Sequence, residues 1–128
     1  MLTNFIILET DPLVLGTSER GFVTDNAWNY YTFQTFTART VSVIITQESA
    51  THDCDVYVKK DGKPTRINYD YADERIGQNT TLAIPNPLQG TFWVGVYGWT
   101  ACAYRVTVVE SSKLLSYSIV ARKYLMNS

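Results

Sequence analysis

Several residue types that carry chemistry are scarce in this chain. Its 128 residues include two cysteines and one histidine, which are too few for a zinc site. No hydrophobic run approaches the roughly 20 residues that cross a bilayer, so we expect no membrane insertion by this fragment. The apolar piece at residues 5–8 is too short for the hydrophobic core of a signal peptide and lacks a basic flank. Export would therefore need a leader that this sequence does not contain.

An excess of charge is missing as well. The chain has 11 basic and 12 acidic residues, a formal net charge of −1 and no run of either sign. Recognition of nucleic acid needs a concentrated basic surface, and a polybasic membrane tether needs a basic cluster. The charge pattern therefore argues against both kinds of partner.

Catalytic motifs are also lacking. The sequence has no G-x-S-x-G, H-E-x-x-H or P-loop pattern. His52 is the only histidine and lies in a polar turn, and a catalytic triad would need a serine or thiol nucleophile beside it. Because both cysteines are expected to be buried, we predict that the protein is not an enzyme.

Aromatic residues, in contrast, are abundant: nine tyrosines, three tryptophans and five phenylalanines make up 13% of the chain. Residues 90–98 read G-T-F-W-V-G-V-Y-G and form the most strand-like stretch. Side chains alternate faces along a strand, which places Phe92, Val94 and Val96 on one apolar face suited to a core. Trp93 and Tyr97 fall on the opposite face.

The same alternation predicts further short strands separated by turn signals. We expect strands at residues 27–36, 40–46, 54–60, 80–84, 90–98 and 102–109. We also expect a turn at 17–21, a hairpin turn at Asp61-Gly62 with positive φ at the glycine, and an irregular, charged excursion at 63–79. Strand spacings of about ten residues predict an all-β fold, a single antiparallel β-sandwich.

Three parts are expected along the chain. Residues 1–12 form a lead-in segment, 13–110 the β-sandwich, and 111–128 a C-terminal segment with a last strand around 114–121. A chain of this length fits a single domain.

Four ordered motifs point to a known family. They are 29–33 (N-Y-Y-T-F), 53–58 (D-C-D-V-Y-V), 90–98 and 104–108 (Y-R-V-T-V), with residues 79–85 between the second and third. Together they resemble the bacterial pre-peptidase C-terminal (PPC) domain over about residues 13–109. The two cysteines depart from the bacterial pattern.

The resemblance implies a jelly-roll-like sandwich that serves as an accessory module, most often beside secreted peptidases. The family includes the collagen-binding domains of clostridial collagenases, and similar modules occur in lumenal parts of amoebal receptors that bind cysteine proteases. We therefore expect a non-catalytic binding module of the extracellular space or the secretory-pathway lumen. The expected partner is a protein, either a protease or a protease substrate.

The resemblance also bears on the carboxylates. In collagen-binding relatives calcium lies between an acidic lead-in and the loop before the tyrosine-rich strand, and the matching residues here are Glu9, Asp11, Asp25 and Asn26. This set offers fewer ligands than the six to eight oxygens that calcium prefers, so a solvated acidic lead-in is the alternative. No cofactor is required otherwise. Asp53 and Asp55 share one face of a strand, and the family implies a structural role in accepting backbone hydrogen bonds.

The cysteines allow two interpretations. Cys54 shares its face with Val56 and Val58, and Cys102 shares the face of Tyr104, so both point between the sheets. They form either a disulfide across the sandwich or two buried free thiols. Asn79-Thr80-Thr81 fits the N-glycosylation pattern, which would agree with a secretory route.

The aromatic residues that face away from the core are the candidate partner-binding site. Tyr57, Trp93 and Tyr97 have the outward parity, and Trp99 lies at the adjacent turn. If exposed together they form a flat platform for a protein partner, or for a glycan if the protein is a carbohydrate-binding module. Alternatively the 63–79 excursion or the C-terminal segment covers them, and the domain is a structural spacer or aids the export and stability of a neighbour.

Overall fold

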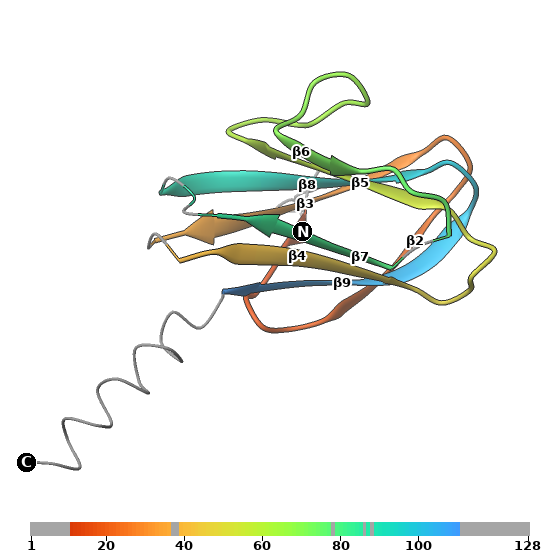
Figure 1. Ribbon diagram of the computed structural model, residues 1–128, viewed down its shortest axis with the longest axis horizontal. Helices are drawn as coiled ribbons and strands as arrows, with labels where there is room; N and C mark the ends of the chain where they lie inside the picture. Colours follow the sequence, from red (N-terminus) through yellow and green to blue (C-terminus); the bar gives the residue numbers. More distant parts are fainter. Residues whose placement is uncertain (1–10, 37–38, 78, 86, 88, 111–128) are drawn as a thin grey trace, which may run out of the picture.

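The computed structural model describes residues 11–36, 39–77, 79–85, 87 and 89–110, and every regular element within these ranges is a β-strand. The strands are β1 (Asp11–Pro12), β2 (Glu19–Val23), β3 (Trp28–Thr35), β4 (Val41–Gln47), β5 (Cys54–Lys60), β6 (Tyr71–Asp73), β7 (Thr80–Ile84), β8 (Gly90–Gly98) and β9 (Cys102–Glu110). They form two sheets, in the orders β1-β3-β8-β5-β6 and β2-β9-β4-β7, which lie face to face (Figure 1). The predicted all-β sandwich is confirmed.

The pairing is antiparallel throughout these sheets except between β1 and β3. β8 lies between β3 and β5, where Phe33 pairs with Phe92 and Val56 with Val96. Phe92, Val94 and Val96 are buried, as the alternation predicts. They meet the inward side chains of β4 and β9, including Val43 and Val106, so both sheets contribute to one core.

Two segments differ from the sequence prediction. The polar stretch expected as a turn at 17–21 contains the start of β2, which pairs with β9 along its whole length. This strand carries little apolar pattern because Phe22 is exposed and Gly21 faces the rings of Tyr31 and Tyr104, where a Cβ would lie 2.5 Å from Tyr104. The 63–79 excursion is largely irregular but includes the three-residue β6, paired with β5. The lead-in residues 1–10 and the expected last strand at 114–121 lie outside the described residues.

A disulfide joins Cys54 of β5 to Cys102 of β9 and so links the two sheets, with a Cα–Cα distance of 5.8 Å. The disulfide interpretation is confirmed, and the alternative of two free thiols is wrong. Gln47 of β4 supports the bridge, because its Oε1 accepts the backbone N–H of Cys54 at 2.7 Å.

A pair of tyrosines also connects the sheets within the core. The hydroxyls of Tyr31 (β3) and Tyr104 (β9) lie 2.6 Å apart, and Asn29 Nδ2 donates to the Tyr104 hydroxyl at 2.9 Å. Tyr104 is fully buried and the bond between the two hydroxyls is buried with it, whereas the bond from Asn29 is partly buried.

We expect Tyr104→Phe to lower the free energy of unfolding by about 1–2 kcal/mol, because it leaves the buried Tyr31 hydroxyl without its partner. Urea denaturation measures this loss. Tyr31→Phe is the control, and its cost should be smaller because Tyr104 then keeps its hydrogen bond from Asn29. A Tyr104→Phe variant as stable as the wild type would contradict the prediction.

Candidate functional site

The outer face of the five-stranded sheet carries a layer of aromatic rings centred on Trp28. The ring centroids of Tyr30, Tyr57 and Tyr97 lie 5.3, 5.4 and 5.0 Å from that of Trp28. Gly95 makes room for this packing, since a Cβ there would lie 2.8 Å from Cζ3 of Trp28. The pairing of β3 and β5 with β8 therefore gathers rings from three strands on one face.

The loop at residues 61–70 covers part of this layer. Its Pro64 is buried, and the Pro64 carbonyl accepts a hydrogen bond from the Tyr30 hydroxyl at 3.0 Å. The Lys63 ammonium lies 5.1 Å from the centroid of the Tyr30 ring. The Tyr69 ring lies 5.3 Å from that of Tyr57. The loop is therefore packed onto the aromatic layer by its own side chains.

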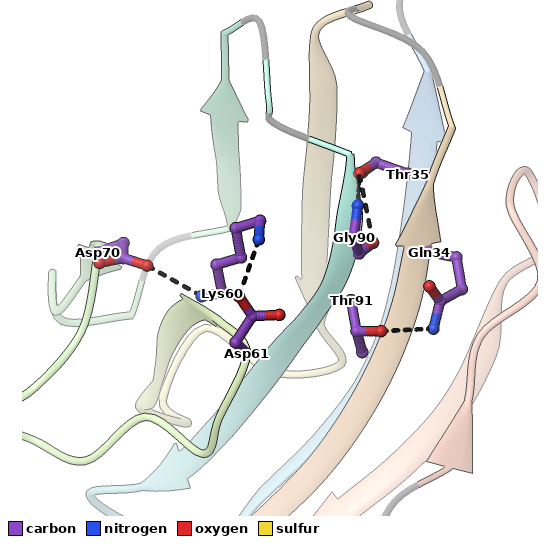
Figure 2. Close-up of polar contacts among 7 residues, drawn as sticks. All are labelled: Gln34, Thr35, Lys60, Asp61, Asp70, Gly90 and Thr91. Atoms are coloured by element: carbon purple, nitrogen blue, oxygen red, sulfur yellow. Dashed lines mark hydrogen bonds and ion pairs between the residues drawn. The ribbon is translucent and has the colours of Figure 1, made fainter.

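Polar contacts fix the base of the same loop (Figure 2). The carboxylate of Asp70 accepts the backbone N–H of Lys60 at 2.9 Å, and the Asp61 N–H donates to the Thr91 carbonyl at 2.9 Å. The positive φ of 64° belongs to Asp61 and not to Gly62, so the glycine-based hairpin prediction is wrong in this detail. Aspartate tolerates this conformation better than most residues with a side chain.

The four aromatic residues predicted as an exposed platform are not equally accessible. Tyr57 and Tyr97 are 0% and 6% exposed, Trp93 is half-buried, and Trp99 is 51% exposed. A platform formed by all four is therefore wrong, and the alternative in which the 63–79 excursion covers the rings holds for Tyr57 and Tyr97. Trp99 remains accessible because it lies in the turn after β8.

Trp99 borders an open, acidic cleft of about 280 Å³ beside the start of β5. We call it the acidic cleft; it is lined by Asp53, Asp55, Arg66, Glu74, Ile76 and Trp99. Asp53 and Asp55 are each 5% exposed, and the Oδ1 atom of each is buried with no hydrogen-bond partner. The strand alternation correctly places both on one outer face, two residues apart.

The pKa values of the two aspartates are raised together. Burial and the negative charges of Asp53 and Glu74 raise the pKa of Asp55, Arg66 lowers it, and the net result is a pKa of about 7. Burial also raises the pKa of Asp53. The pKa of the Tyr57 phenol is raised by burial and by its hydrogen bond to the Glu74 carboxylate. Near neutral pH the acidic cleft thus holds less negative charge than its three carboxyl groups suggest.

The buried Oδ1 atoms of these aspartates accept no backbone hydrogen bond, and the structural role that the family implies for the pair stays a prediction. The backbone connects this segment to the β8–β9 turn instead. The Asp53 carbonyl accepts the N–H of Trp99 at 3.0 Å, and Thr100 Oγ1 accepts the N–H of Asp53 at 3.1 Å.

Arg66 stands at the edge of the acidic cleft. Its guanidinium carbon lies 4.9 Å from the Tyr97 ring centroid and 4.8 Å from that of Trp99. It hydrogen-bonds to Tyr57 but forms no ion pair with any carboxylate in the described part of the chain. The buried aspartates are therefore influenced by Arg66 without being neutralised by it.

Exposed apolar side chains occur in this region: Ile76 and Trp99 line the acidic cleft, and Ile67 and Tyr69 belong to the 61–70 loop that also carries Arg66. Ile67, Ile76 and Tyr69 are 93%, 78% and 40% exposed. Trp99 is exposed as well, and its ring contacts the guanidinium of Arg66. We call Ile67, Tyr69, Ile76 and Trp99 the loop surface. Large apolar side chains in water, set beside a charged cleft, are typical of a binding surface.

The residues predicted to hold calcium are not assembled in the described ranges. Asp25 Oδ1 accepts the N–H of Ala101 at 2.6 Å, and Asn26 Oδ1 accepts the hydroxyl of Tyr97 at 2.8 Å. Asp11 lies instead beside Glu19, and their hydrogen bond, with burial, raises the pKa of Glu19 to about 7. Glu9 lies outside the described residues. Within those residues no three His, Cys, Asp or Glu side chains are placed to hold a metal, and calcium binding stays a prediction.

The remaining candidate residues have structural surroundings. Nδ1 of His52 accepts the N–H of Ala103 at 3.2 Å, and both cysteines are bonded to each other. Asn79 is exposed and its Oδ1 accepts the N–H of Gln47, so its glycosylation stays a prediction. Within the described ranges, no helix is long and apolar enough to cross a membrane.

Several solved structures share this fold. The PPC domain of a Bacillus anthracis collagenase matches with a TM-score of 0.61 and 16% identity, covering 82% of this chain and 99% of that domain. The Aeromonas hydrophila protein PliG, a periplasmic inhibitor of g-type lysozyme, matches with a TM-score of 0.64 and 16% identity over 80% of this chain and 96% of its own. The solution structure of vEP C-ter 100 has a TM-score of 0.59 and 24% identity over 76% and 95%.

No family model matches the chain, and no curated protein matches its sequence. The structural matches confirm the predicted resemblance to the PPC domain at the level of the fold. The chain is a PPC-like β-sandwich.

Sequence reasoning missed four residues of this region. Trp28 and Tyr30 had the outward parity of the strand at 27–36, and pairing of that strand with 90–98 would have placed them beside Trp93 and Tyr97. Arg66 and Glu74 lie in the irregular segment 63–79, which has no period to place its side chains. No sequence signal would have brought those two to the start of β5.

Proposed function

We propose that this protein is a non-catalytic protein-recognition module of an exported protein, and that its loop surface is the contact region. The observation that carries the proposal is the exposure of Ile76 and Trp99 in the lining of the acidic cleft, together with that of Ile67 and Tyr69 in the neighbouring loop. Tyrosine and tryptophan are enriched in the centres of protein interfaces. A partner would remove these apolar side chains from water.

The packing of the loop supports a preformed surface. Pro64, Lys63 and Tyr69 contact the aromatic layer, and Asp70 ties the loop back to Lys60. A surface fixed before binding loses less conformational entropy when the partner arrives. The loop surface therefore suits a specific partner.

The disulfide supports an oxidising compartment, because such bonds persist in secreted and periplasmic proteins and are rare in the cytosol. Two similar structures fit this setting. One is a domain of a collagenase and the other a periplasmic lysozyme inhibitor. We extend to this chain the idea of a protein partner, with a protease, its substrate or another hydrolase as the expected class.

The two alternatives receive less support. A carbohydrate-binding module needs flat aromatic rings open to the sugar, and two of the four candidate rings are covered. A structural spacer has no need for exposed apolar side chains such as Ile76 and Trp99 in the lining of a charged cleft.

The test is affinity capture from the extracellular fraction of the source organism with the immobilised domain. A Trp99→Ala/Ile76→Ala variant should capture at least tenfold less of a protein that the wild type retains. Val14→Ala/Phe36→Ala is the matched control, because these side chains are also exposed but lie outside the loop surface. The control should retain the protein at the wild-type level.

Equal capture by all three forms would contradict the proposal and favour a spacer. Release of the captured material by free monosaccharides would favour the carbohydrate-binding module. Circular dichroism and urea denaturation of each variant establish that a lost partner does not reflect a lost fold.

A further inference from the structure

The acidic cleft holds two buried carboxyl groups whose hydrogen bonds are incomplete. Asp53 and Asp55 are each 5% exposed, and one oxygen of each has no partner. A buried polar atom that lacks a hydrogen bond costs about 1–3 kcal/mol, and more when the group carries a charge. Such an arrangement in the wall of an open cleft indicates a position where a ligand completes the bonds.

We propose that the acidic cleft binds a cationic side chain, arginine or lysine, presented by a protein partner. This inference rests on the function proposed above and names the chemistry of the residue that the partner inserts. The guanidinium or ammonium group would donate to Asp53 and Asp55. Glu74, which also lines the cleft, adds negative charge.

The other walls suit the apolar stem of the same side chain. Trp99 and Ile76 line the acidic cleft, and both are largely exposed. Arginine and lysine bury their methylene groups against apolar surface while the charged head reaches a polar partner. An indole ring also attracts a cation on its face. The lining of the acidic cleft thus combines negative charge with apolar side chains.

Arg66 shows that the aromatic side of the cleft accepts a guanidinium group. Its guanidinium carbon lies 4.9 and 4.8 Å from the ring centroids of Tyr97 and Trp99, and no ion pair joins it to Asp53 or Asp55. A second cation is therefore still favourable.

A metal ion fits the same groups less well. Calcium prefers six to eight oxygen ligands, whereas the acidic cleft supplies three carboxyl groups. No three acidic, histidine or cysteine side chains in the described residues have metal-binding geometry. An extended organic cation also uses Trp99 and Ile76, which a metal ion does not.

The charges that face Asp55 determine how binding depends on pH. Burial raises its pKa, Asp53 and Glu74 raise it as well and Arg66 lowers it, so that the pKa lies at about 7. An incoming cation favours the ionised pair. Binding should therefore strengthen as the pH rises from 6 to 8.

The experiment is an NMR titration of the ¹⁵N-labelled domain with N-acetyl-arginine amide, N-acetyl-lysine amide and the uncharged N-acetyl-citrulline amide. Saturable shifts are expected at the Trp99 indole N–H and the Ile76 amide with at least one cationic probe. The stronger of the two probes identifies the residue type. The citrulline probe should cause shifts at least tenfold smaller than those of the stronger cationic probe at the same concentration.

Two charge-matched variants localise the binding. Asp55→Asn should weaken the binding of the cationic probe at least tenfold while keeping the shape of the site. Asp61→Asn removes one carboxylate from the opposite end of β5, at a φ that asparagine also tolerates, and should bind like the wild type. Any of three results would overturn the proposal. The citrulline probe could bind as strongly as the cationic probes, the two variants could affect binding equally, or calcium chloride could saturate the same shifts at a lower concentration.

The outcomes separate this inference from the function on which it rests. Capture of a protein through the loop surface with no probe binding at the acidic cleft would refute the cationic contact alone. Probe binding with equal capture by the wild type and the loop-surface variant would refute the recognition function instead.

Discussion

Reduction of the Cys54–Cys102 bond is expected to lower the free energy of unfolding by about 4 kcal/mol. The two cysteines are separated by 48 residues, so the bond closes a long loop in the unfolded chain and restricts its conformations. Because a domain of this size is stabilised by about 5–15 kcal/mol in total, the loss is a large part of its stability. Urea denaturation with and without dithiothreitol measures the difference directly.

A Cys54→Ala/Cys102→Ala variant is the control for this experiment. It should resemble the reduced wild type in stability and should not respond to dithiothreitol. Both cysteines are buried in the core, so the variant also loses some packing and should be slightly less stable than the reduced protein. A difference below about 1 kcal/mol between oxidised and reduced wild type would contradict the chain-entropy account.

The strands could be predicted from the sequence because their two faces differ. Residues 90–98 alternate between a face of Phe92, Val94 and Val96 and a face of larger aromatics, and the sandwich buries the first face. β2 had no such alternation. Its Gly21 is required by the close approach of Tyr104 from β9, a contact 83 residues away that no local pattern records.

The candidate site was predictable only in part. Parity correctly grouped Asp53, Asp55 and Tyr57 on the outer face of β5, but parity does not tell whether an outer face is in water. What covers Tyr57 and Tyr97 is the irregular loop with Arg66 and Tyr69, held by ring stacking and not by periodic apolar burial. The acidic cleft likewise depends on the irregular segment that brings Glu74 into the same cleft as the two aspartates.

Asp55→Asn is expected to stabilise the protein at pH 8, by on the order of 2 kcal/mol. The pKa of Asp55 is about 7 in the folded protein against an ordinary value of 3.8. Between these values the folded state binds more protons than the unfolded state, so the wild type loses stability as the pH rises from about 4 to about 7. The full shift would correspond to about 4 kcal/mol, and screening by water in the open cleft reduces it.

The measurement is the free energy of unfolding of wild type, Asp55→Asn and Asp61→Asn from pH 4 to pH 8. The stabilising effect of Asp55→Asn should be small at pH 4, where Asp55 is protonated in the folded wild type, and should reach its maximum above pH 7. Asp61→Asn should show no such rise, since its carboxylate is exposed and pairs with Lys60 at the surface. If Asp55→Asn were neutral or destabilising at pH 8, the carboxyl would already be satisfied within the fold. The acidic cleft would then have no unmet charge to offer a partner, so this stability experiment also tests the premise of the cationic contact.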